Sequence, residues 1–573
     1  MLDVKIAGGS VVDGTGAARR RADVGIEDGR LVQIGDVDES AARTIDASGL
    51  IVAPGFVDIH THYDAQAFWD PALTPSPLHG VTTIVGGNCG FTIAPLAASE
   101  ADYLMRMLAR VEGMPLESLA EGVPWNWHSF GEYLDRLDGT LAVNAGFLVG
   151  HSALRRVVMG EAAVGSEATP EQTQQMAALL SESIAAGGLG FSSSQAPTHN
   201  DGDGNPVPSR AATRDELISL ARVVGNHPGT TLEFIPTVGA FADEHVELMT
   251  DMSLAANRPL NWNVLVVGAG TDGYLDQLAA SDRAAERGGR VLALTVPCVM
   301  QLHLNFRSGF LFDALPGWGP TMALPLAEKR AALDEPAVRT RLREAAESDA
   351  GLFGRLLRWD RLRVGETFAP ENESLAGQTI GEIAAQRGQH PFDTLCDIAI
   401  ADDLCTDLLP PSGGDDAESW RRRAEVWRDH RAVVGASDAG AHLDMLATFN
   451  YTTSLLAASR AHDLVGLEEA VHLLTDVPAR LYGIRERGRI AEGWRADLVM
   501  FDERRVAPAP VQTRYDLPAG AGRLYAGAEG VEHVLVNGVE IVRSGELTGD
   551  RPGTLLRSGR DTETVEAADV RAG

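Results

Sequence analysis

The feature that most constrains this chain is the alternation of short apolar runs with helical patterns over residues 54–484. Apolar residues recur at three-to-four spacing between several of the runs, which indicates helices. Eight runs have the length and composition of buried strands, at residues 55–60, 81–86, 142–150, 188–192, 230–236, 259–267, 290–296 and 432–437. Eight strands that alternate with helices predict an α/β fold, a (β/α)8 TIM barrel.

The region 54–484 is longer than such a barrel requires. A minimal (β/α)8 barrel needs about 250 residues, so the surplus must lie in insertions, mainly at residues 97–140 and 297–376. Long connections between strands usually carry function. We therefore expect these two insertions to form lids or walls of a substrate site.

Both ends of the chain have short strand patterns with tight turns. Asp28-Gly29 and Asn537-Gly538 are dipeptides typical of type I′ hairpin turns. Because neither end has enough strands for a core of its own, residues 1–53 and 485–550 are expected to combine into one small β-sandwich. Residues 551–573, rich in charged residues and Thr, are expected to form a mobile tail.

Composition restricts the partners of this chain. Lys and Arg total 49 against 80 Asp and Glu, a formal net charge of −31, which disfavours nucleic acid and anionic membranes. The short basic run RRRA at 421–424 is expected to form a solvated helix face. No stretch approaches the roughly 18 apolar residues of a membrane span, and the four cysteines form no disulfide framework. We therefore predict a cytoplasmic protein with a small-molecule substrate.

Two histidines follow the first apolar run of the predicted barrel. In Gly55-Phe56-Val57-Asp58-Ile59-His60-Thr61-His62, residues two apart on a strand face the same way, so both imidazoles can bind one ion. A His-x-His pair without a metal is common. This pair, however, lies where a barrel strand ends, on the face that is catalytic in such barrels. His60 and His62 are therefore candidate metal ligands.

The eighth run is followed by Ser437-Asp438-Ala439-Gly440-Ala441-His442. In a closed barrel the eighth strand lies beside the first, which would place Asp438 next to the two histidines. Its carboxylate could bind a metal and take a proton from metal-bound water. The alternative is that Asp438 merely caps a helix.

Several motifs follow one another in the order of a known family. They are VKIAGGSVVDGTG, DVGIEDGRLVQIG, PGFVDIHTHYD, GVTTIVGGNCGFTIAP, VGHSALRR, HPFDTLCDIAIADD, ASDAGAH and RGRIAEGWRADLVMFD. With these motifs the chain resembles the amidohydrolase superfamily, and within it the N-acyl-D-amino-acid deacylases (D-aminoacylases). The resemblance implies a metal-dependent barrel flanked by a β-sandwich from both chain ends, and hydrolysis of a linear amide. It also implies that Cys89 binds the metal, although a buried free thiol is the alternative; a thiolate suits zinc.

The chain departs from that family at three strands. Many amidohydrolases bridge two metals with a carboxylated lysine on strand four, but Lys5 and Lys329, the only lysines, lie outside that strand. The deacylases also use histidines on strands five and six, where this chain has Glu233 and Asn261 or Asn263. We therefore expect one principal Zn²⁺ site and no complete second site.

Four further residues are candidates for contact with the substrate: His151, His199, Glu233 and Arg307. For His151 the alternative is a buried, hydrogen-bonded histidine, and for Arg307 it is a surface salt bridge. His199 lies in a polar loop, 198–205, that partly resembles a calcium loop but lacks its distant glutamate.

Three functions are compatible with these patterns. The first is hydrolysis of an N-acyl-D-amino acid by metal-activated water, with Asp438 as proton shuttle. The second is hydrolysis of another C–N or ester bond, cyclic amides included, since two expected histidines are replaced. The third is a barrel that only binds a ligand, which the presence of His60, His62 and Asp438 disfavours.

Overall fold

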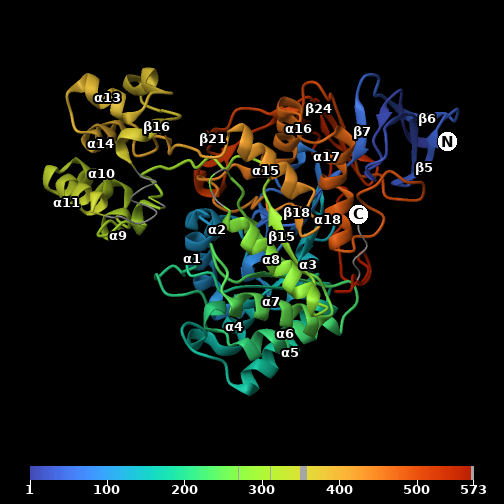
Figure 1. The fold of residues 1–573 in the computed structure, drawn as a ribbon, viewed down its shortest axis with the longest axis horizontal. Helices are drawn as coiled ribbons and strands as arrows, with labels where there is room; N and C mark the ends of the chain where they lie inside the picture. The colour runs from blue at the N-terminus through green and yellow to red at the C-terminus, as the bar shows by residue number, and fades with distance from the viewer. Residues whose placement is uncertain (269, 271, 310, 349–357, 569–573) are drawn as a thin grey trace.

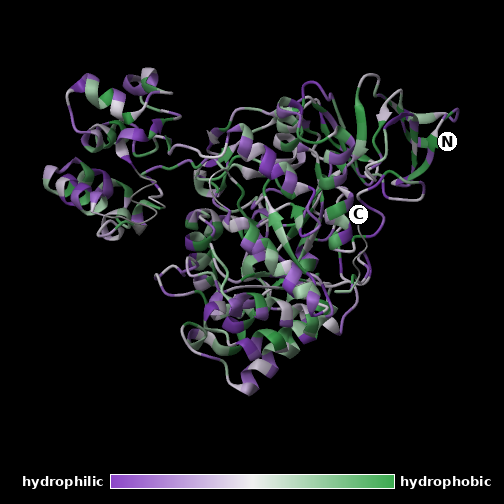
Figure 2. Cartoon of the chain, viewed as in Figure 1, coloured by the Kyte–Doolittle hydropathy of each residue, from purple (hydrophilic) through white to green (hydrophobic). Residues whose placement is uncertain are grey.

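The computed structural model describes residues 1–268, 270, 272–309, 311–348 and 358–568 of the chain. It is a mixed α/β protein with a central body, a β-rich end that carries the N-terminus, and a helical lobe that projects from the body (Figure 1). Apolar residues line the central strands, while hydrophilic residues are frequent on the surrounding helices (Figure 2). In the described part of the chain, no helix has both the length and the apolar character to cross a membrane.

The eight predicted strands are all present and run parallel. Their bounds are β8 Phe56–Asp58, β9 Val81–Gly86, β10 Asn144–Phe147 continued by β11 Val149–Gly150, β12 Gly190–Ser194, β13 Thr231–Ile235, β14 Leu260–Leu265, β15 Val291–Thr295 and β18 Ala432–Val434. They form two sheets, in the orders β10-β9-β8 and β11-β12-β13-β14-β15-β18. The two sheets are contiguous in sequence at Leu148, between β10 and β11.

The first and eighth strands meet just beyond their carboxyl ends. The described residues form no ladder between β8 and β18 themselves. Instead, the backbone N–H of His62 donates to the Ala439 carbonyl at 2.7 Å, and that of Asp438 donates to the His60 carbonyl at 3.1 Å. The eight-stranded α/β architecture is thus confirmed, and its two ends are joined at the residues that form the candidate site.

Helices separate most of these strands, and their ends follow local sequence signals. The bounds are α1 Ala101–Val111, α2 Leu116–Gly122, α3 Phe130–Leu137, α4 His151–Met159, α5 Pro170–Ala185, α6 Arg214–Gly225, α7 Asp243–Ala256, α8 Gly273–Glu286, α15 Ala417–Trp427, α16 Tyr451–His462, α17 Leu467–Leu474 and α18 Asp476–Leu481. Helix α5 is an example of such a signal, because the Thr169 hydroxyl accepts from the backbone of Gln172 and Pro170 occupies the first turn.

Strands from both chain ends share one sheet, as the sequence predicts. β7 (Ile51–Pro54) pairs with β19 (Leu498–Phe501), within a seven-stranded sheet that ends in β24 (Val531–Val536), β25 (Val539–Arg543) and β26 (Glu546–Leu547). A four-stranded sheet of β1 (Leu2–Ala7), β4 (Asp23–Glu27), β5 (Arg30–Gly35) and β6 (Ala41–Asp46) shares a buried apolar cluster with it.

The predicted turn dipeptides connect the hairpins of these two sheets. Asp28 and Gly29 join β4 to β5, and Asn537 and Gly538 join β24 to β25. All four have positive φ, between 47° and 79°, which is the conformation of a type I′ turn.

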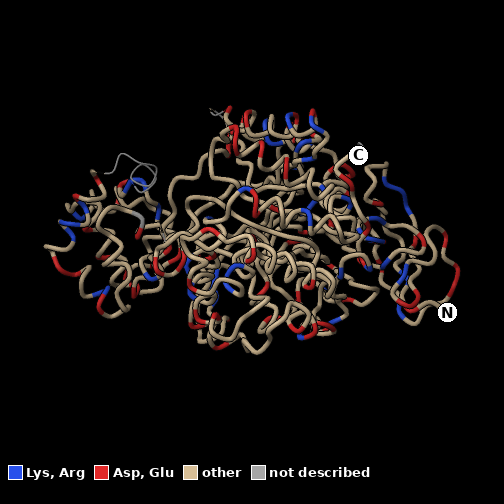
Figure 3. The backbone as a smooth tube through the Cα atoms, turned by 90° about the horizontal axis from the view of Figure 1, so that it is seen from below, with Lys and Arg blue, Asp and Glu red and all other residues tan. Residues whose placement is uncertain are grey.

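The insertion after β15 forms the helical lobe, which is larger than residues 297–376. Its helices are α9 Gly319–Met322, α10 Leu326–Asp334, α11 Pro336–Glu347, α13 Ile380–Arg387 and α14 Pro391–Ala401. An apolar cluster that runs from Leu304 to Leu408 forms its own core, separate from that of the body. Acidic and basic residues are interspersed over the lobe and the body (Figure 3).

The prediction of a mobile tail is wrong for residues 551–568. Leu555 and Leu556 are buried, and the Leu556 N–H donates to the Ala145 carbonyl of β10 at 2.7 Å. Thr562 is also buried, against Gly229. Two adjacent leucines bury enough apolar surface to hold this otherwise polar segment against the body.

Candidate functional site

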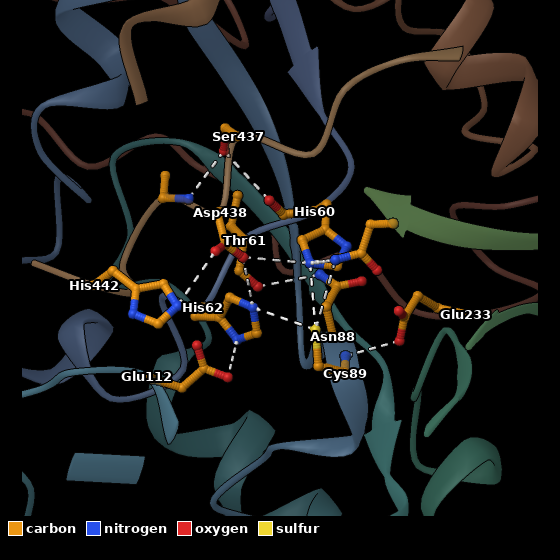
Figure 4. Close-up of polar contacts among 12 residues, drawn as sticks. His60, Thr61, His62, Asn88, Cys89, Glu112, Glu233, Ser437, Asp438 and His442 are labelled. Carbon is orange, nitrogen blue, oxygen red and sulfur yellow. Dashed lines mark hydrogen bonds and ion pairs between the residues drawn. The ribbon is translucent and has the colours of Figure 1, made fainter. Parts of the chain in front are cut away.

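Four side chains from three strand ends meet at the carboxyl-terminal side of the parallel strands. His60 and His62 follow β8, Cys89 follows β9, and Asp438 follows β18 (Figure 4). Because these strands are parallel, their carboxyl ends lie on the same side of the sheet. The structure therefore brings together all four residues that the sequence nominated as metal ligands.

The separations among these side chains are those of groups that share one ion. The Cys89 Sγ lies 3.5 Å from Nε2 of His60 and 3.7 Å from Nε2 of His62. Asp438 Oδ1 lies 3.1 Å from Nε2 of His62 and 3.5 Å from Nε2 of His60. In a tetrahedral zinc site with Zn–N of about 2.0 Å and Zn–S of about 2.3 Å, neighbouring ligand atoms are about 3.5 Å apart. Two imidazoles, a thiol and a carboxylate are also ligand types that zinc takes.

Backbone strain accompanies two of these residues. Cys89 and Asp438 have φ of 57° and 58°, in the left-handed region that costs energy for residues other than glycine. Gly87 and Gly90 flank Cys89 and also have positive φ, which gives the loop after β9 its tight course. Such strain persists where the surrounding structure enforces it, and it is common at functional sites.

Asp438 is the member of the cluster that faces solvent. Its side chain is 28% exposed, whereas those of His60 and His62 are buried. Burial alone would raise the pKa of the Asp438 carboxyl, but hydrogen bonds from the two imidazoles hold it well below its ordinary value. An ionised, accessible carboxylate beside two histidines can accept a proton from water.

A carboxylate from the 97–140 insertion reaches the same cluster. Glu112, at the end of α1, is buried and places Oε1 3.4 Å from Nδ1 of His62. Burial alone would lower the pKa of His62, but the carboxylates of Glu112 and Asp438 raise it to about 9. Because Glu112 contacts Nδ1, Nε2 remains directed at Cys89 and Asp438.

Strands five and six supply an acid and an amide instead of histidines. Glu233 on β13 is buried, and its Oε2 accepts the backbone N–H of Cys89 at 2.7 Å. Burial raises the pKa of Glu233 to about 8. Asn263 on β14 places Nδ2 3.1 Å from Nε2 of His60, whereas Asn261 bonds to the Leu232 carbonyl and the Tyr482 hydroxyl. Of the two asparagines, Asn263 is the one at the cluster.

Several buried acidic groups surround this cluster. Glu112, Glu233 and Asp64 are buried, and burial raises their pKa values to about 7, 8 and 6, respectively. Together with Asp438 they surround the two imidazoles with acidic groups. A divalent ion at the His60, His62 and Cys89 atoms, which all lie within 4.8 Å of one another, would favour the ionised forms of these acids.

Sequence reasoning missed two residues of this site. Glu112 lies far from any motif, and nothing in its neighbourhood signalled a role. His442, by contrast, is the last residue of the ASDAGAH motif and could have been nominated. Its Nε2 lies 3.9 Å from Asp438 Oδ2, so the imidazole lies next to the Asp438 carboxylate. Its backbone, like that of Asp438, has a positive φ, of 47°.

His199 lies at the edge of the site. Its Nδ1 is 2.7 Å from the Ser194 hydroxyl, and its ring packs edge-on against Phe91. Burial lowers its pKa to about 3, and the charges of His442 and Asp438 also act on it. In the loop around it, Asp201 uses one carboxylate oxygen to accept the N–H groups of Asp203 and Asn205.

Two predicted substrate contacts are placed elsewhere. His151 is fully buried, with Nδ1 2.8 Å from Ser193 and Nε2 2.8 Å from Glu216, which also pairs with Arg155. It therefore holds helix α4 against its neighbours, as the alternative interpretation had it. Arg307 belongs to the helical lobe, where its guanidinium donates to the Cys405 sulfur at 3.5 Å. Among the residues that the structure describes, Arg307 forms neither the surface salt bridge of the alternative interpretation nor a contact with the cluster.

Comparison with known proteins gives consistent results. The model of the amidohydrolase family matches residues 43–542. A D-aminoacylase of Alcaligenes xylosoxydans xylosoxydans is 29% identical, over 97% of this chain and 97% of that protein. A solved D-aminoacylase structure, described by its binuclear metal centre with one-metal activation and second-metal attenuation, has a TM-score of 0.63 at 26% identity and covers 97% of this chain and 100% of its own. The N-acyl-D-glutamate deacylase of Bordetella bronchiseptica, solved with zinc and a phosphonate that mimics the tetrahedral intermediate, has a TM-score of 0.64 at 27% identity, with the same coverage.

Proposed function

This chain belongs to the amidohydrolase family, and we propose that it is a metal-dependent hydrolase of a linear amide. The proposed substrate is an N-acyl-D-amino acid. The observation that carries the proposal is that the ligand atoms of His60, His62 and Cys89 all lie within 4.8 Å of one another, with Asp438 Oδ1 3.1 and 3.5 Å from the two imidazoles. The names of the relatives supply the substrate class, since the amide bond of an N-acyl-D-amino acid is what D-aminoacylases and N-acyl-D-glutamate deacylases cleave.

We propose His60, His62, Cys89 and Asp438 as the groups that hold one divalent ion, zinc in the first place. When bound, such an ion polarises an amide carbonyl and makes water acidic enough to attack near neutral pH. Glu233 and Asn263 stand where the resemblance led us to expect histidines, and one carboxylate oxygen of Glu233, Oε2, already accepts the Cys89 N–H. A single principal site is therefore the arrangement that these residues support.

Asp438 performs the proton transfers in this proposal. Its carboxylate oxygens take a proton from the attacking water and return it to the nitrogen of the departing amine, so that amide and water become a carboxylate and an amine. Its partial exposure leaves the carboxylate accessible to water for the first of these steps. Glu112 holds His62 through Nδ1, and His199 and His442 flank the space in which a substrate would lie.

The parts of the fold have distinct roles in this proposal. The barrel, residues 54–484, carries the chemistry, and the insertion at 97–140 completes the site through Glu112. The pairing of β7 with β19 joins the two halves of the sandwich, residues 1–53 and 485–550, and Asp497 of the sandwich accepts a hydrogen bond from Asn144 of β10. Residues 551–568 brace the barrel from outside.

The test is a substrate screen of metal-loaded protein. We expect hydrolysis of N-acyl-D-amino acids in preference to the L enantiomers, cyclic amides and esters, and loss of turnover after chelation with recovery on adding zinc. Full activity in metal-free protein would overturn the metal role. Turnover of cyclic amides or esters alone would overturn the substrate class and leave the metal site standing.

A further inference from the structure

A cavity opens on the same face as the metal cluster, beside the carboxyl ends of β14 and β15. It has a volume of about 340 Å³ and is lined mainly by aliphatic side chains, among them Val264, Val266, Val267, Val296 and Met300. Val266 is 57% exposed, which is unusual for a valine and places an apolar surface at the rim. The volume is within the range of small-molecule sites.

One charged side chain lines this apolar cavity. Arg423 on α15 is only 6% exposed, so the expectation of a solvated RRRA helix face is wrong for this residue. Arg421 is exposed and pairs with Glu425, whereas Arg422 is partly buried and pairs with Glu418. Successive residues of a helix are rotated by about 100° around its axis, so Arg423 faces inward although Arg421, two residues earlier, faces solvent.

The guanidinium of Arg423 has no acidic partner in the described part of the chain. Its Nη1 donates to the Gly414 carbonyl at 2.5 Å, and its planar group lies 4.6 Å from the centre of the Trp420 ring. The nearby acids are engaged elsewhere: Asp415 accepts from the Trp420 indole, and Asp416 accepts from Ser419. A guanidinium has five N–H donors, so most of its hydrogen-bonding capacity is available.

Burial of an unpaired guanidinium costs free energy unless an anion pairs with it. We propose that this cavity is a binding site for an amphiphilic carboxylate, such as a medium-chain aliphatic acid. The carboxylate accepts from Arg423 in the planar, two-bond arrangement that guanidinium groups favour, and the aliphatic chain lies against the valines and Met300. Removal of the chain from water and neutralisation of the buried cation both favour binding.

The cavity adjoins the metal cluster without including it. Asn263, the residue before Val264, contacts His60 Nε2, so the cavity wall begins one residue from the cluster. The carboxylate that binds Arg423 could belong either to one end of a long substrate or to a separate free acid. The site itself does not depend on the proposed reaction, because none of the cavity residues named above belongs to the cluster.

Calorimetric titration of the full-length protein with octanoate tests the proposal. Titrations are performed on the metal-loaded protein and again after chelation, with octan-1-ol and octylamine as uncharged and cationic matches. We expect saturable octanoate binding that survives chelation and is at least about tenfold tighter than that of the alcohol, the size of effect that a charge-assisted hydrogen bond gives. Binding that disappears with the metal would assign octanoate to the cluster and overturn the proposal.

Variants then locate the site. Arg423→Met should remove the preference for octanoate over octanol, and Arg423→Lys should retain part of it. Arg421→Met, on the exposed face of the same helix, is the matched control and should behave as the parent. Val266→Glu, at the exposed rim, should weaken octanoate binding by repulsion and serves if Arg423→Met does not fold. Unchanged octanoate affinity in either folded variant would overturn the assignment.

Octanoate as a competitor distinguishes the two sources of the carboxylate. If the cavity holds one end of a substrate, octanoate should raise the KM of hydrolysis and leave kcat unchanged. If it holds a free acid, octanoate should bind to the enzyme with substrate already present and change kcat. Either result supports the site, whereas absence of saturable octanoate binding to the parent protein overturns it.

Discussion

The carboxylate of Glu112 lies 3.4 Å from Nδ1 of His62, and both groups are buried. One comes from an inserted helix and the other from the end of the first barrel strand. A histidine that binds a metal usually gives its second ring nitrogen to a carboxylate or carbonyl, which fixes the tautomer and the ring orientation. The insertion thus takes part in the candidate metal site, beyond forming a wall around it.

Glu112→Gln and Glu112→Ala should each weaken zinc binding by about 10–100-fold, the usual effect of losing such a partner. The physical reason is that His62 loses the negative charge that favours its Nδ1–H form. Competition with a chromophoric chelator measures the affinity. Glu121→Gln, exposed on α2 of the same insertion, is the control. Unchanged affinity in both Glu112 variants would show that the contact is incidental.

Asp438→Asn should keep the fold and much of the metal, and lower kcat by about 10²–10⁴-fold, the usual contribution of general acid–base catalysis. The amide is similar in size but cannot accept the proton from water. Steady-state kinetics alongside metal analysis separates the two effects. Near-normal turnover would remove Asp438 from the mechanism.

Cys89→Ala should weaken zinc binding by about 10–100-fold or more, because its sulfur lies 3.5 and 3.7 Å from the two imidazoles. Cys396→Ala, which removes a buried thiol from the core of the helical lobe, is the matched control. It should reduce stability without changing the metal content. Equal metal content in the two variants would make Cys89 a core thiol.

Glu216→Gln should destabilise the fold by about 3–5 kcal/mol, since it leaves the buried Arg155 guanidinium without its carboxylate. Zinc affinity, measured by chelator competition in the folded fraction, should not change. Chemical denaturation gives the free energy of unfolding. A variant of parental stability would contradict the structural role assigned to Glu216 and His151.

Glu540→Gln should lower stability at neutral pH by about 1 kcal/mol, a modest value because Arg43 and Arg543 are partly exposed. Burial alone would raise the pKa of Glu540, but hydrogen bonds from Arg543, Arg43 and His533 lower it. A lowered folded-state pKa stabilises the protein above the ordinary pKa of 4.5, and this contribution is lost as the pH falls through the folded value. Melting temperatures of parent and variant should therefore converge in acid; a constant difference would contradict the assignment.

The sequence by itself determined the elements and the ligand spacing. Strand length, helical periodicity and turn dipeptides are local properties, so the eight parallel strands and the Asp28-Gly29 and Asn537-Gly538 turns were predictable. The two-residue spacing of His60 and His62 is likewise local, since it follows from the period of a strand. Asp438 required one further assumption, that the ends of the first and eighth strands meet, which their backbone hydrogen bonds satisfy.

Only the tertiary structure decided which side chains face one another across distant segments. Glu112 reaches His62 because the α1 insertion folds over the strand ends. His151 is withdrawn from the substrate space because Glu216 and Ser193 satisfy both ring nitrogens. Arg423 turns inward while Arg421 stays exposed, and Leu555 and Leu556 attach a polar segment to β10. These outcomes depend on burial and on partners far away in sequence, and neither is encoded in a short stretch of residues.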